Sequence, residues 1–234
     1  MKIQNPFRYF KTLPEVIRLA VMLSIRYPLS LRNVEDLRHE RGIDICHETI
    51  RFWWNRFGPI FTKEIRNKRI YPSGNYSNWR WHLDEVFVKI NGELQYLWRA
   101  IDYEGEVLEV FVTKRRNRKA ALAFLKKAMK RHGRPKEIVT DKLVSYGAAM
   151  KVIGNADKQE TGRWKNNRCE NSHLPFRRRE YAMLHFRDMG SLQKFVSVHS
   201  SVYDHFNHQR HLVSRHKFKQ DRSASLVEWQ QLCA

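Results

Sequence analysis

Trp81-His82-Leu83-Asp84-Glu85-Val86-Phe87-Val88-Lys89-Ile90 is the stretch of sequence that decides the fold. Read as a strand, it alternates, so that Asp84 shares one face with three β-branched residues while Glu85 points to the other face. A carboxylate on a buried face is costly unless it is paired or binds a cation. Either the strand end is frayed and Asp84 points to solvent, or Asp84 belongs to a functional site.

The residues that follow predict an antiparallel meander. Asn91-Gly92 is typical of a two-residue hairpin turn. We expect a partner strand from Gln95 to Asp102, which ends that strand as a turn residue, then a turn at 103–105 and a third strand from Val107 to Thr113.

A second aspartate follows a short apolar run further along the chain. The pattern of Lys119–Arg131 predicts an amphipathic helix, and Glu137–Thr140 reads as a buried strand with Asp141 at its carboxyl end. Ligand sites in open α/β sheets favour such strand ends. If this strand lies parallel to the 81–90 strand, Asp84 and Asp141 meet, and paired carboxylates suit Mg²⁺. The fold class is therefore α/β, with a mixed sheet.

Composition and charge limit the kinds of partner that the protein is expected to bind. The 234 residues include 44 Lys and Arg against 24 Asp and Glu, a net charge of +20, which favours a polyanion, with a merely basic, ribosomal-type protein as the alternative. Three widely spaced cysteines predict reduced thiols, and no apolar run is long enough to span a membrane. The start of the chain does not look like a secretion signal, so we expect a cytoplasmic protein that associates with the nucleoid when bound to DNA.

The first 62 residues predict three helices. They run from Leu13 to Tyr27, from the cap at Ser30 to Gly42, and over a third segment that Gly58-Pro59 is expected to end. This pattern indicates a helix-turn-helix; a bundle that docks another protein is the alternative. On the helix-turn-helix reading, the outward residues that reach DNA are Arg51, Asn55 and Arg56.

Four segments follow from these patterns. They are a DNA-binding domain (1–62), a linker (63–79), a catalytic domain (80–190) and a C-terminal helical segment (191–234). The last segment holds five histidines but no thiolate among them that would suggest zinc, so we expect them to decorate a helix that faces DNA or a partner subunit. They are His199, His205, His208, His211 and His216.

Three short motifs, in this order and spacing, carry a resemblance that covers nearly the whole chain. They are Trp-His-Leu-Asp-Glu at 81–85, Thr-Asp-Lys at 140–142 and Asn-Asn-Arg-Cys-Glu-Asn at 166–171. Together they resemble the DDE transposases of bacterial insertion sequences, in particular the small members that join a helix-turn-helix to a ribonuclease H-like catalytic domain. The resemblance implies Mg²⁺-dependent DNA cleavage and strand transfer, with Mn²⁺ as the alternative ion.

The resemblance also implies site residues and partners. Matched to the motifs, Asp84, Asp141 and Glu170 form the metal-binding triad, with Glu160 and Glu180 as alternatives for the third acid. Glu85 is left out because it points to the other sheet face. The partners would be the terminal inverted repeats and target DNA, bound by a dimer or larger homo-oligomer.

Basic side chains near the acids are expected to contact DNA phosphates, although a solvated loop is the alternative for the run at 114–119. They are Arg115, Arg116, Arg118, Arg177 and Arg178. Other functions stay open: a non-catalytic DNA-binding regulator derived from a transposase, or a ribonuclease H-like nuclease that cuts without joining strands.

Overall fold

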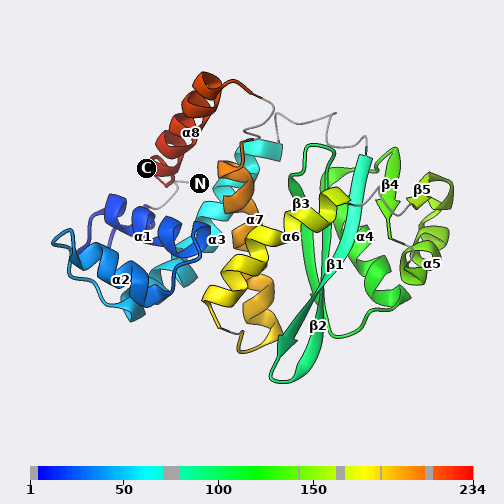
Figure 1. Cartoon of the computed structure of the whole chain (residues 1–234), viewed down its shortest axis with the longest axis horizontal. Coiled ribbons are helices and arrows are strands. Elements are labelled where there is room, and N and C mark those ends of the chain that lie inside the picture. The colour runs from blue at the N-terminus through cyan, green and yellow to red at the C-terminus, as the bar shows by residue number, and fades with distance from the viewer. Residues whose placement is uncertain are drawn as a thin grey trace.

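Three helices form the N-terminal part of the protein, as predicted. The computed structural model describes residues 5–70, 80–141, 143–161, 167–184, 186–208 and 213–233, without the side chains at 69, 70 and 167–171. The helices are α1 (Pro14–Arg26), α2 (Leu31–His39) and α3 (His47–Ile70) (Figure 1). Ser30 caps α2 by accepting a hydrogen bond from the Asn33 amide at 3.0 Å. After α2, Gly42 adopts a φ of +70°, which glycine tolerates best.

Helix α3 does not end at Gly58-Pro59, so the prediction of a helix end there is wrong. Its 24 residues continue to Ile70 and carry a buried stripe of Trp53, Phe57, Phe61 and Ile65. A proline inside a helix costs about 3 kcal/mol. Burial of each side chain in this stripe stabilises the fold by about 1.5–3 kcal/mol, so packing outweighs the cost of the proline. Of the predicted linker, positions 63–70 are helical, and positions 71–79 lie outside the described residues.

The sheet has five strands in the order β3-β2-β1-β4-β5. The hairpin of β1 (Arg80–Ile90) and β2 (Glu93–Ile101) turns through Asn91 and Gly92, both at positive φ, and β3 (Val107–Thr113) extends the meander. Strand β4 (Glu137–Thr140) pairs in parallel with β1, and β5 (Gln159–Thr161) pairs in parallel with β4. The predicted mixed α/β class is confirmed.

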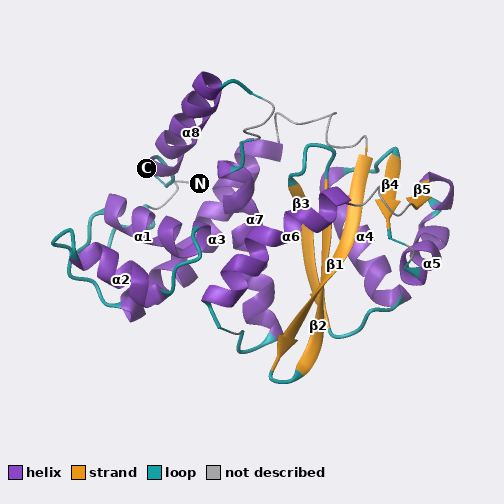
Figure 2. Cartoon of the chain, viewed as in Figure 1, coloured by secondary structure: helices purple, strands orange, loops and turns teal. Residues whose placement is uncertain are grey.

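Helices cover both faces of this sheet, as Figure 2 shows. One face packs Trp81, Leu83 and Trp98 against α4 (Arg118–His132) and α5 (Val144–Ile153), which leads through the short helix η1 (Ala156–Lys158) to β5. The other face packs Val86 and Val88 beneath α6 (Asn167–Ala182) and α7 (Met189–Phe206). The alternation predicted for β1 is therefore present.

Helix α7 joins the sheet to the N-terminal helices. Its residues Phe195 and Val196 belong to the core of the sheet, whereas Val198 and Val202 belong to the core formed by α1 and α3. Gly58 of α3 lets the two helices approach, because a Cβ there would lie 3.3 Å from Val198. The four-segment division stays a prediction, but the two described cores meet along α7.

Two of the C-terminal histidines do not lie where they were expected. His199 and His205 are buried. His205 Nε2 donates to the Ser225 carbonyl of α8 (Arg215–Gln230) at 2.9 Å, and His208 Nε2 lies 2.9 Å from Ser225 Oγ. The prediction that these rings decorate an outward helix face is therefore wrong for His199 and His205. His216 is exposed, and His211 lies outside the described residues. Among the described helices, none combines the length and the apolar character that crossing a membrane demands.

Candidate metal centre

The two aspartates predicted to meet lie side by side where β1 passes the end of β4. The parallel β1–β4 register pairs Leu83 with Thr140, so Asp84, within β1, lies next to Asp141, which directly follows the last residue of β4. Carboxylate oxygens of Asp84, Glu85 and Asp141 all lie within 4.8 Å of one another. In the described part of the chain, this is the group of three acidic or metal-ligating side chains that could hold an ion.

Backbone amides hold both aspartates in place. Asp84 Oδ1 accepts from the Glu85 amide at 2.8 Å, and Asp141 Oδ1 accepts from the Leu143 amide at 3.0 Å. The buried hydroxyl of Thr140 donates to the Asp141 carbonyl at 2.7 Å and accepts from Gln159 Nε2 at 2.9 Å. Hydrogen bonds from the chain itself therefore fix both carboxylates.

Glu85 is the member of this cluster that sequence reasoning left out. It does lie on the other sheet face, with 2% of its side chain exposed, and Arg116 Nη1 donates to its Oε1 at 2.9 Å. Burial, and then the negative charge of Asp141, raise the pKa of Glu85, while Arg116 opposes that rise. Strand β4 stops at Thr140, so the longer glutamate side chain reaches Asp141 past the strand end. The alternating pattern predicted the correct sheet face for Glu85, but it did not predict that the side chain extends to Asp141.

Arg116 was expected to contact DNA, and the structure places it at the acidic cluster. Besides its ion pair with Glu85, its guanidinium lies 5.2 Å from the centre of the Phe87 ring. Arg115 and Arg118, from the same basic run, are exposed. The run therefore supplies one cation to the site and presents others to solvent.

Helix α6 passes over the aspartates. The Ser172 carbonyl accepts from Arg99 Nη1 at 2.8 Å, and Arg99 is the cross-strand partner of Asp84. His173 Nε2 lies 3.7 Å from Asp84 Oδ2. Burial, then the charges of Arg99 and Arg177, lower the pKa of His173 to about 3, so this ring is neutral near pH 7.

The proposed third acid lies in the same helix. Glu170 belongs to the first turn of α6, but its side chain lies outside the described part of the structure. Of the two alternatives, Glu180 accepts from Arg177 Nη1 at 2.6 Å, and Glu160 lies in β5 beside Val139. Neither alternative joins the described acidic cluster.

Arg177 and Arg178 differ in their surroundings. Arg177 Nη2 donates to the Phe87 carbonyl at 2.7 Å, which ties α6 to β1, while Arg178 is exposed. Arg177 is therefore engaged within the protein, and Arg178 is accessible to a ligand.

The outward residues predicted for the recognition helix all lie on α3. Arg51 Nη1 lies 3.0 Å from Glu48, and Asn55 Oδ1 accepts from Lys194 Nζ at 2.9 Å. The Arg56 guanidinium lies 5.6 Å from the centre of the Phe10 ring. Asn55 and Arg56 are exposed and Arg51 is half-buried.

The chemistry of the acidic cluster fits a hard divalent cation. Ions such as Mg²⁺ bind through carboxylate oxygens and keep open positions for water and substrate phosphates. Three carboxylates that converge within 4.8 Å, two of them fixed by backbone amides, offer this donor set. A divalent metal site is thus built into the junction of β1 and β4.

Comparisons with known proteins agree with this site. A family model described as a DDE domain, DDE_Tnp_IS240, matches residues 78–209. The transposase for insertion sequence-like element IS431mec of Staphylococcus aureus (strain Mu50) is 34% identical over 176 residues, 72% of this chain and 75% of that protein. The transposase for insertion sequence element IS257 in transposon Tn4003, from the same species, is 33% identical with the same coverage.

Solved structures that resemble the chain more distantly include an HTLV-2 integrase catalytic core domain in complex with magnesium. It is 16% identical, with a TM-score of 0.45, over 62% of this chain and 98% of that one. The family model covers more than half of the chain, and it coincides with the strands and helices that build the acidic cluster. The chain belongs to the DDE transposases of bacterial insertion sequences, metal-dependent enzymes that cut DNA and transfer its strands.

Proposed function

We propose that Asp84, Asp141 and Glu170 hold the divalent ions of this transposase, that Glu85 is a fourth carboxylate of the site, and that Mg²⁺ is the working ion with Mn²⁺ as a substitute. The observation that carries the proposal is the convergence of Asp84, Glu85 and Asp141 within 4.8 Å where β1 passes the end of β4. Like charges this close repel one another, so a bound cation offsets a cost that the protein otherwise bears.

The course of α6 supports Glu170 as the third acid. His173 of this helix lies 3.7 Å from Asp84, and Arg177 bonds to the Phe87 carbonyl. Residues three apart on a helix share one face. This period leads us to expect Glu170, one turn before His173, on the face of α6 that His173 shares. Glu180 lies beyond Arg177, further along the helix.

The site prepares a phosphodiester for attack. Two divalent ions, when bound, supply the charge that activates the attacking hydroxyl and stabilises the leaving oxygen. The carboxylates of Asp84 and Asp141, fixed by the Glu85 and Leu143 amides, set the positions of these ions before DNA arrives. Arg116 limits the repulsion between the cluster and the phosphates, because it neutralises Glu85. No covalent bond between protein and DNA is required.

Calorimetric titration of the full chain with Mg²⁺ and with Mn²⁺ tests these assignments separately from activity. Asp141→Asn and Glu170→Gln each remove one anionic ligand and are expected to weaken binding by about tenfold or more. Glu180→Gln is the matched control, since its carboxylate pairs with Arg177, and it should bind like the wild type. Wild-type affinity in Glu170→Gln together with lost affinity in Glu180→Gln would transfer the role to Glu180.

The helix α3 is proposed to read the terminal inverted repeats through Arg51, Asn55 and Arg56. The net charge of +20 supports DNA as the partner, and exposed Arg115, Arg118 and Arg178 are proposed to contact phosphates of the repeats or of target DNA. Because two element ends must be brought together, we propose a dimer or larger assembly on DNA.

Binding measurements over a range of salt concentrations separate these two groups of residues. Asn55→Ala should lower the preference for the element's own ends by about 1–3 kcal/mol. Arg118→Ala should weaken binding to every sequence and reduce the slope of log affinity against log salt by about one. Tight and selective binding without cleavage under any metal would favour the non-catalytic regulator instead.

A further inference from the structure

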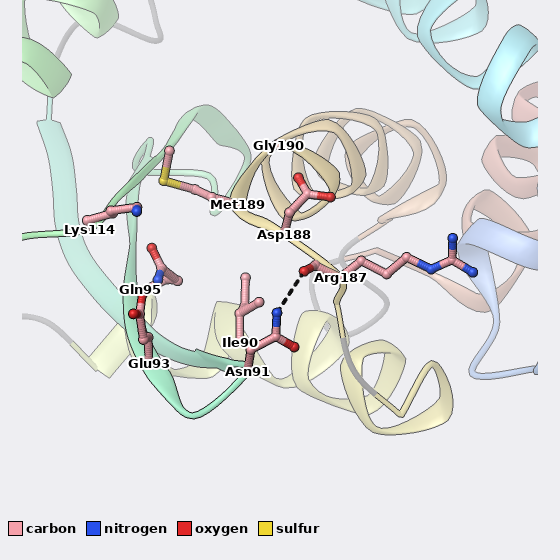
Figure 3. Close-up of a pocket in the computed structure, with 9 residues that line it drawn as sticks. All are labelled: Ile90, Asn91, Glu93, Gln95, Lys114, Arg187, Asp188, Met189 and Gly190. Atoms are coloured by element: carbon pink, nitrogen blue, oxygen red, sulfur yellow. Dashed lines mark hydrogen bonds between the residues drawn. The ribbon is translucent and has the colours of Figure 1, made fainter.

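A pocket of about 410 Å³ lies at the hairpin end of β1, away from the metal centre. Ile90 and Gln95 line it from the hairpin strands, Lys114 follows β3, and Arg187 and Met189 lie at the start of α7 (Figure 3). Asn91 Nδ2 donates to the Arg187 carbonyl at 3.2 Å and ties the hairpin to α7. Nothing in the proposed metal chemistry uses this pocket.

Gln95 is the unusual member of the lining. Its residue is 4% exposed, and within the described part of the chain its Oε1 accepts no hydrogen bond. A buried acceptor left unpaired loses the hydrogen bond that water would supply, and native proteins rarely leave one. Since Gln95 lines the pocket, a ligand that donates a hydrogen bond there would satisfy it.

Acceptors outnumber cations around Gln95. The Arg187 side chain points away from the other lining residues (Figure 3), which leaves Lys114 with Glu93 and Asp188, and both Asp188 oxygens already accept from Ser191, at 2.8 and 2.6 Å. An acceptor-rich pocket suits a group with N–H donors better than a phosphate. The side chains of Ile90 and Met189 add apolar walls that can pack on a flat ring.

We propose that this pocket holds one unstacked nucleobase of the bound DNA, with its exocyclic amine donating to Gln95 Oε1. Glutamine and carboxylate side chains accept from the amines of adenine and cytosine, and guanine also carries an amine, whereas thymine has none. This inference rests on the proposed DNA binding. Withdrawing a base from the stack costs a few kcal/mol, which the new contacts must offset.

The distance to the metal centre gives the position of that base. Six residues of β1 separate Asp84 from Ile90, and a strand rises about 3.3 Å per residue, so the pocket lies about 20 Å from the acidic cluster. Nucleotides along one DNA strand are about 3.4 Å apart. The unstacked base is therefore expected about six nucleotides from the cut.

The test uses 2-aminopurine, a base that retains an exocyclic amine and fluoresces more strongly when unstacked. The full-length protein is mixed, with chelator so that the DNA stays intact, with duplexes of the element's end that carry the analogue at one position each. A labelled target duplex is measured separately. We expect a several-fold rise at one position of the end duplex, and thymine at that position should weaken binding by about tenfold.

Variants connect the signal to the pocket. Gln95→Leu should abolish the rise, and Lys114→Ala, at the exposed rim where folding is not at risk, should reduce it. Lys126→Ala is the matched control, since Lys126 is exposed on α4 and does not line the pocket, and it should leave the rise unchanged.

Two results would overturn the inference: no position responds, or the response survives in both Gln95→Leu and Lys114→Ala. If strand joining by the wild type is intact in either case, the proposed function stands and only the role of the pocket falls. If the protein neither binds the end duplex nor joins strands, the proposed function falls together with the inference.

Discussion

Lowering the pH from 7.5 to 5 is expected to destabilise the protein through the buried His199 and the half-buried His173. His199 of α7 lies among Phe176, Phe195 and Tyr203, with ring centres 5.5–6.3 Å away. Burial, then the charges of Arg99 and Arg179, lower its pKa to about 3. The pKa of His173 is also lowered to about 3, mainly by burial. Both rings are thus neutral in the folded state.

The sign and size of the effect follow from proton linkage. Between the ordinary histidine pKa of 6.5 and the folded value of about 3, the unfolded chain binds a proton that the folded chain does not. Stability therefore falls as the pH falls through 6.5. From pH 7.5 to 5 each histidine contributes a loss of about 2 kcal/mol, about 4 kcal/mol for the pair. Typical domains are stable by only about 5–15 kcal/mol, so this loss is large.

Urea unfolding at both pH values, for wild type and His199→Phe, isolates the contribution of His199 to this loss of stability. Carboxyl groups with raised pKa, such as Glu85 and Asp102, gain stability as the pH falls, but they contribute equally to both proteins. The variant should lose about 2 kcal/mol less than the wild type over this interval. His216→Gln, at an exposed ring, is the control. An identical pH-dependent loss in wild type and His199→Phe would refute the buried, neutral assignment.

Three further predictions concern packing, a buried cation and the metal site. Trp229→Ala should cost about 3–5 kcal/mol in urea unfolding, because the ring is 2% exposed and packs on Phe61, with centres 5.4 Å apart; a loss below 1 kcal/mol would contradict that packing. Arg179 is buried and its guanidinium donates to the Ser24 carbonyl. Arg179→Met should change the free energy of unfolding by no more than about 2 kcal/mol, because the variant no longer buries a charge and this gain offsets the lost hydrogen bonds. Arg179→Ala also leaves a cavity and should therefore lower the free energy of unfolding further. Glu85→Gln should weaken Mg²⁺ binding about tenfold in calorimetry with unfolding unchanged within about 1 kcal/mol, and wild-type affinity would remove Glu85 from the site.

Local sequence patterns predicted the part of the fold that carries the site. Alternation over residues 81–90 and the Asn91-Gly92 turn specify the hairpin, since a one-residue slip would expose Val86 and Val88. The parallel pairing of β1 with β4 then brings Asp84 beside Asp141. Strand period and turn chemistry are local, so they are readable without a structure.

Other features depend on contacts between segments that are distant in sequence. Helix α3 continues past Pro59 because α7 supplies the surface that buries its second half. Glu85 joins the acidic cluster because β4 ends early, and Arg116 meets Glu85 across 31 residues of sequence. Helix α5 and strand β5, which no local pattern led us to expect, are positioned by packing on α4 and β4. Single-segment patterns do not contain this information.

The most direct test of the enzyme is strand transfer in vitro. Purified protein, labelled duplex carrying the element's ends and a supercoiled target would be incubated with Mg²⁺, with Mn²⁺ or with chelator, beside Asp141→Asn and the exposed control Asp157→Asn. We expect joined product that requires the metal, disappears in Asp141→Asn and persists in Asp157→Asn. Joining by Asp141→Asn at the wild-type rate, or tight binding to the ends without any joining, would contradict a metal-dependent transposase centred on Asp84 and Asp141.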